Sequence, residues 1–151
     1  MEIKTFSDVI DIAIKREEST AELYIQLSQK KGISEEMRKT FELFAKQELG
    51  HKAYLLRIKN TGVYTLAEEP PIDLKLDEYL KPIEMGEHYT YQDALIIAMK
   101  IEKASYNLYN LLAHNTSDSK VKELFKRLSY EELHHKHIFE QEYDRLFLSE
   151  N

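Results

Sequence analysis

Four stretches of the chain repeat apolar residues at alternating spacings of three and four, and a glutamate interrupts each repeat near its middle. This spacing puts the repeated residues on one face of an α-helix, here called a seam, which helices bury by packing together. The seams are Phe6, Ile10, Ala13, Glu17, Thr20, Tyr24 and Leu27; Met37, Phe41, Phe44, Glu48, His51, Leu55 and Ile58; Tyr91, Leu95, Ala98, Glu102, Ser105, Tyr109 and Leu112; and Val121, Phe125, Leu128, Glu132, His135 and Phe139, with Leu146 beyond Glu142. The pattern predicts an all-α fold, an antiparallel four-helix bundle with carboxylates in its core.

Turn and capping residues delimit the helices. We expect helices over 7–30 with Ser7 as N-cap, from after Ser34 to 60, from after Thr90 to 113, and over 118–148. The third helix begins with a segment that resembles a capping box, 90–93. One domain over 1–151 follows, with a helical hairpin 7–60, a crossover 61–90 that could hold a short helix near 73–80, and a helical hairpin 91–148.

The two hairpins look like copies of one unit. Residues 13–24 align with 98–109 at an offset of 85 (102 − 17), and 44–52 align with 128–136 at an offset of 84 (132 − 48). Glu17 and Glu48 lie 15 and 16 residues from Gly32, and Glu102 and Glu132 each lie 15 from Ser117. Because antiparallel helices rise by the same amount per residue, we expect all four carboxylates at one level of the core.

Buried carboxylates at close range need compensation, since each isolated ion costs several kcal/mol to remove from water. Two divalent cations would balance four glutamates. His51 and His135 each follow a seam glutamate by three residues, which places Glu and His on the same helix face. With no cysteine in the chain, a metal must be bound by carboxylate and imidazole.

The alternative is a buried ion-pair network. Glu131 and His134 share the same spacing, but they lie off the seam and out of register with the second helix.

This constellation resembles the ferritin-like di-iron carboxylate family, and specifically its rubrerythrin-like branch, in a stand-alone form. The resemblance implies a set of metal ligands: Glu17, Glu48, His51, Glu102, Glu132 and His135. It also implies that Tyr24 and Tyr109 lie beside the site, although large aromatic residues on a seam are more often core. Two features depart from the family: the absence of a cysteine-ligated rubredoxin module, and Ser105 where rubrerythrins carry a further glutamate.

By the same resemblance, we expect two metal ions, Fe before Mn or Zn, in a non-haem oxidoreductase that reacts with O2 or H2O2 as an oxidase, peroxidase or ferroxidase. An external electron-donor protein and a homodimer are implied. The alternatives are iron storage, and a metal-stapled sensor or interaction bundle without catalytic turnover. The net charge of −6 argues against a nucleic-acid partner. No apolar run is long enough to span a bilayer, so we expect no membrane partner and a cytoplasmic location.

Overall fold

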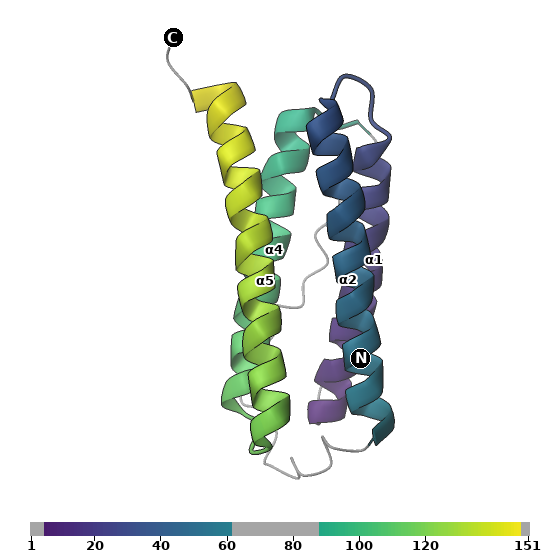
Figure 1. Cartoon of the computed structure of the whole chain (residues 1–151), viewed down its shortest axis with the longest axis vertical. Coiled ribbons are helices and arrows are strands. Elements are labelled where there is room, and N and C mark those ends of the chain that lie inside the picture. Colours follow the sequence, from purple (N-terminus) through teal and green to yellow (C-terminus); the bar gives the residue numbers. More distant parts are fainter. Residues whose placement is uncertain (1–4, 62–87, 149–151) are drawn as a thin grey trace. The chain divides into compact units, whose positions relative to one another are not determined.

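The computed structural model describes residues 5–61 and 88–148, and in these two ranges the regular elements are all helical. They are α1 (Phe6–Ser28), α2 (Glu35–Thr61), α4 (Tyr91–His114), α5 (Ser119–Tyr143) and the π-helical turn η2 (Asp144–Leu148). Helices α1 and α2 form one antiparallel hairpin and α4 and α5 another (Figure 1). The first hairpin lies in one compact unit of the chain, and α4 with most of α5 lies in another. The predicted short helix near 73–80 lies outside the described residues.

Reciprocal capping boxes begin α1 and α4. At α1 the Asp8 amide donates to Thr5 Oγ1 at 3.1 Å, and the Thr5 amide donates to Asp8 Oδ2 at 3.0 Å. The prediction of Ser7 as N-cap was therefore wrong by two residues. Thr5 has an aspartate three residues later, whereas Ser7 has Ile10 there, which cannot return the hydrogen bond. The box predicted at α4 is confirmed, with Thr90 and Asp93 paired at 3.0 and 3.1 Å.

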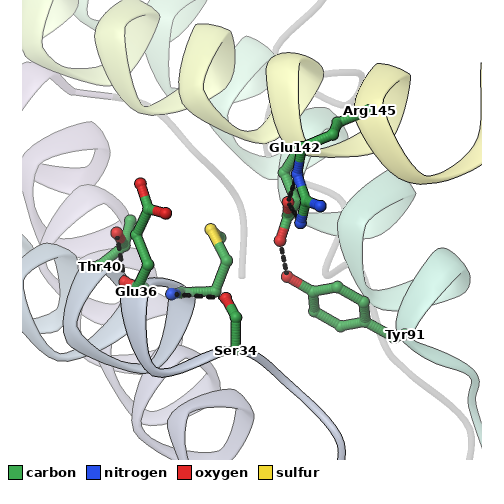
Figure 2. Close-up of polar contacts among 7 residues, drawn as sticks. Ser34, Glu36, Thr40, Tyr91, Glu142 and Arg145 are labelled. Atoms are coloured by element: carbon green, nitrogen blue, oxygen red, sulfur yellow. Dashed lines mark hydrogen bonds and ion pairs between the residues drawn. The ribbon is translucent and has the colours of Figure 1, made fainter. Parts of the chain in front are cut away.

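Single hydroxyl or carboxylate caps begin the other two helices. Ser34 Oγ accepts from the Met37 amide at 3.1 Å, as Figure 2 shows, and Asp118 Oδ1 accepts from the Val121 amide at 2.9 Å. Gly32, in the connection between α1 and α2, has a φ of +89°. That left-handed conformation is costly for any residue with a Cβ, so a glycine here lets the chain reverse.

The predicted seams are the buried faces of the helices. Within the first hairpin, the Tyr24 ring lies 6.0 Å from Phe41 and 6.5 Å from Phe44, centroid to centroid. Within the second, Tyr109 lies 6.3 Å from Phe125. All the seam residues of α1 and α2 are buried, as are those of α4 and α5 apart from two at one end, Tyr91 and Leu146. The three-and-four spacing thus identified much of the core, and apolar residues off the seams, such as Val9, Ala94 and Leu108, are buried as well.

The end of α5 departs from the prediction of one α-helix to Leu148. The α-helix ends at Tyr143, and η2 follows. A π-turn adds a residue to each hydrogen-bonded ring and so shifts the direction of later side chains. Leu146 is accordingly 41% exposed, although the seam spacing predicted it to be buried. Among the described residues, no helix has the length and apolar character required to cross a membrane.

Candidate metal centre

The first hairpin brings three buried ionisable side chains together. Glu17 comes from α1, Glu48 and His51 come from α2, and none is more than 2% exposed. His51 Nδ1 lies 3.6 Å from Glu17 Oε2 and 4.0 Å from Glu48 Oε2. Each residue offers a ligand atom within 4.8 Å of the others'. We call these three residues the first triad.

The second hairpin holds the same arrangement in Glu102 from α4 and Glu132 and His135 from α5, here called the second triad. The two carboxylates are fully buried and the imidazole is 1% exposed. His135 Nδ1 lies 3.4 Å from Glu102 Oε1. The three ligand atoms again lie within 4.8 Å of one another.

Helix geometry explains why each triad forms. A separation of three residues places Glu48 and His51 on one face of α2, and Glu132 and His135 on one face of α5. The glutamate of the partner helix meets them because it lies equally far from the turn of its hairpin. The matched heights predicted within each hairpin are therefore confirmed by the Glu17–His51 and Glu102–His135 contacts.

The donor atoms of each triad suit a transition-metal ion. Two carboxylates carry the charge that balances one divalent cation, and imidazole nitrogen with carboxylate oxygen is a common ligand set for Fe, Mn and Zn. In both triads the imidazole directs Nδ1 toward the carboxylates, so this nitrogen faces the position that a metal would take. Burial of the donors in apolar seams would also limit the access of water.

The competing pair on α5 lies where its register predicts. Glu131 is half-buried and His134 is exposed, so this pair faces away from the seam. The other histidines outside the triads, His88, His114 and His137, are exposed as well, and His137 Nδ1 lies 3.7 Å from Glu140. Only His51 and His135, among the histidines, are buried.

Tyr24 and Tyr109 are both fully buried two turns beyond the glutamate of their own helix. Each ring packs against phenylalanine of the partner helix in its hairpin, which is the core role. Their predicted place beside the metals stays a prediction.

Tyr91, Glu142 and Arg145 form a polar group that the sequence did not predict. The Tyr91 hydroxyl donates to Glu142 Oε2 at 2.9 Å, and Arg145 Nε donates to Glu142 Oε1 at 3.0 Å (Figure 2). Glu142 is only 7% exposed. Burial, and then the hydrogen bond to Glu142, raise the pKa of Tyr91 well above its ordinary value. The sequence feature that could have indicated this group is a seam carboxylate followed three residues later by an arginine.

Comparisons with known proteins agree with this geometry. The family model for rubrerythrin matches residues 8–143. A crystal structure from Thermotoga maritima that carries the name ferritin-like diiron-carboxylate protein matches with a TM-score of 0.73 and 23% sequence identity, over 95% of each chain. At that identity the likeness shows the fold, which is the ferritin-like four-helix bundle. No curated protein matches the sequence.

Proposed function

The chain belongs to the rubrerythrin family, and we propose that it is a non-haem di-iron protein that reacts with O2 or H2O2. The observation that carries the proposal is the repeated triad. Each hairpin supplies two buried carboxylates and one buried imidazole, which is the ligand set that the metals of di-iron carboxylate bundles use. We further propose that the six residues of the two triads are the ligands of two metal ions.

Two ferrous ions, when bound, would supply the two electrons that reduce a peroxide or begin the reduction of O2. The protein's own part follows from its residues. The four glutamates neutralise the charge of two divalent ions, and the Nδ1 atoms of His51 and His135 complete the donor set. Thr20 and Ser105, one turn beyond Glu17 and Glu102, are buried residues with small side chains. We propose that their small size leaves room for a small oxidant.

Repeated turnover requires a source of electrons. Because the chain has no cysteine, it contains no thiolate-ligated iron centre of its own. We therefore propose an external electron-donor protein, and a homodimer as the working form. Iron storage and a metal-stapled sensor bundle are the alternatives, and both would bind metal without multiple turnover.

The test is an anaerobic titration of metal-free protein with Fe(II), followed by O2 or H2O2 while the near-ultraviolet absorption of oxidised iron is recorded. We expect two irons per chain and rapid oxidation. Glu48→Ala and Glu132→Ala should abolish stoichiometric binding, whereas Glu131→Ala, a matched change on the same helix but off the seam, should not. Absence of stoichiometric binding by the wild type would refute the di-iron proposal. A single turnover despite excess reductant would favour storage or sensing.

A further inference from the structure

The internal repeat reveals an asymmetry at the open ends of the hairpins. Applying the offsets of 85 and 84, Tyr91 corresponds to Phe6 (91 − 6) and Glu142 corresponds to Ile58 (142 − 58). Phe6 and Ile58 are buried apolar residues of the first hairpin, 6% and 5% exposed. The second hairpin places a tyrosine and a glutamate at the same seam positions. The second hairpin therefore has a polar pair where the first hairpin has an apolar pair.

The polar pair is fully hydrogen-bonded. One carboxylate oxygen of Glu142 accepts from the Tyr91 hydroxyl, and the other accepts from Arg145 (Figure 2). Next to it, Gln92 Nε2 donates to the Tyr143 hydroxyl at 3.0 Å. The first residues of α4 are thereby joined to the last turn of α5. Replacing both partners of a buried hydrogen bond by apolar residues can be nearly neutral or stabilising, so stability alone is a weak reason for this arrangement.

The first hairpin joins its helices in another way. Lys52 Nζ lies 2.5 Å from Glu18 Oε1, and Lys59 Nζ lies 2.6 Å from Asp11 Oδ1, which gives two ion pairs between α1 and α2.

The residues at the corresponding positions of the second hairpin cannot form either ion pair. The positions that correspond to Glu18 and Lys52 hold Lys103 and Lys136, which carry like charges. Those that correspond to Asp11 and Lys59 hold Ile96 and Tyr143, which cannot form an ion pair. The described contacts between the first residues of α4 and the last turn of α5 at the open end are the hydrogen bonds of Tyr91 and Gln92.

We propose that Tyr91 and Glu142 are positioning residues, whose hydrogen bond holds α4 and α5 in the register that brings Glu102 opposite His135. The short turn at 115–118 fixes the hairpin at one end, and the Tyr91–Glu142 bond fixes the other, with the second triad between them. Hydrogen bonds are directional and set register, whereas an apolar contact tolerates sliding. This role rests on the proposed function, because it concerns the same ligands.

Three measurements on three variants test the proposal: the α4–α5 distance, the affinity for Co(II) as the probe metal, and the melting temperature. Tyr91→Phe removes only the hydroxyl group. Glu142→Gln retains an oxygen atom that can accept the hydrogen bond of the Tyr91 hydroxyl. The double variant Tyr91→Phe/Glu142→Ile reproduces the apolar pair of the first hairpin. Tyr130→Phe is the matched control, because Tyr130 is a 66% exposed tyrosine of α5. The absence of native cysteine allows spin labels at Lys100→Cys and Gln141→Cys, two exposed positions, to report the α4–α5 distance in metal-free protein.

We expect Tyr91→Phe and the double variant to broaden the α4–α5 distance distribution and to weaken Co(II) binding by about 10-fold, the lower range for groups that orient metal ligands. Glu142→Gln and the control should bind as the wild type does. The double variant should melt no lower than the wild type, which separates positioning from stability.

Equal Co(II) affinities in all variants would overturn the positioning role and leave the proposed function intact, as would weaker binding that simply followed a lower melting temperature. Failure of the wild type itself to bind two Co(II) would overturn the proposed function and the positioning role together.

Discussion

Removal of one buried charge, in Glu102→Gln, should change the stability of the metal-free and metal-loaded proteins in opposite directions. Glu102 is fully buried, and its ligand atom lies within 4.8 Å of that of Glu132. At an effective dielectric constant of about 20, two unit charges at this distance repel by about 3.5 kcal/mol. Glutamine keeps the shape and removes the repulsion, at the cost of part of the attraction to His135.

The lost repulsion exceeds the lost attraction, so the net effect expected in metal-free protein is stabilisation by about 1–3 kcal/mol. For a chain of this size about 1 kcal/mol shifts the melting temperature by about 2–4 °C, so we expect a rise of about 2–12 °C. The loaded protein should respond in the other direction. A metal at 100 times its dissociation constant stabilises the fold by about 2.7 kcal/mol per site, and Glu102→Gln should lose this contribution for at least one site.

Thermal unfolding followed by circular dichroism, with chelator and then with excess Co(II), measures both changes in one preparation. A buried ion-pair network predicts the opposite sign without metal, because loss of a partner from such a network costs about 3–5 kcal/mol. A melting temperature that falls by about 6–20 °C in chelator would therefore refute the metal-site reasoning. Glu131→Gln, a half-buried glutamate off the seam, should leave both melting temperatures unchanged.

Three further outcomes follow from single residues. His51→Ala should remove at least one of two bound Co(II) ions in a calorimetric titration, whereas the exposed His134→Ala should remove none; equal losses would contradict the assignment. Gly32→Ala should lower the unfolding free energy by about 1 kcal/mol in urea, because no neighbouring atom blocks a Cβ and the cost is that of the positive φ alone. The raised pKa of Tyr91 means that the folded state holds this proton more tightly. Its stabilising contribution should be complete below the unfolded pKa near 10 and decline as the pH rises above it, and Tyr91→Phe should show a shallower alkaline loss of stability.

Much of the structure could be predicted from local sequence patterns, because helices are stabilised by contacts between residues three and four positions apart. The seam spacing identified the buried face of each helix, and equal distances from the turns predicted the contacts of Glu17 with His51 and of Glu102 with His135. The Thr90–Asp93 capping box could also be predicted from the sequence, since both partners lie within a segment of four residues. The ligand roles and the joining of the two triads into one centre remain predictions that the metal titrations test.

The tertiary structure decided the features that depend on competing or distant partners. Ser7 was the predicted cap of α1, and the reciprocal hydrogen bonds with Asp8 show that Thr5 is the cap instead. The change to a π-turn after Tyr143 exposes Leu146. A prediction that assumes a constant α-helical period does not include such a change. The pairing of Glu142 with Tyr91 spans 51 residues. Sequence alone determined that the chain folds into helices with carboxylates and imidazoles on their buried faces, since that depends on spacing within each helix. The packing of α4 against α5 decided which groups bind a seam glutamate such as Glu142. A buried carboxylate accepts hydrogen bonds from the donors that the neighbouring helix brings within reach.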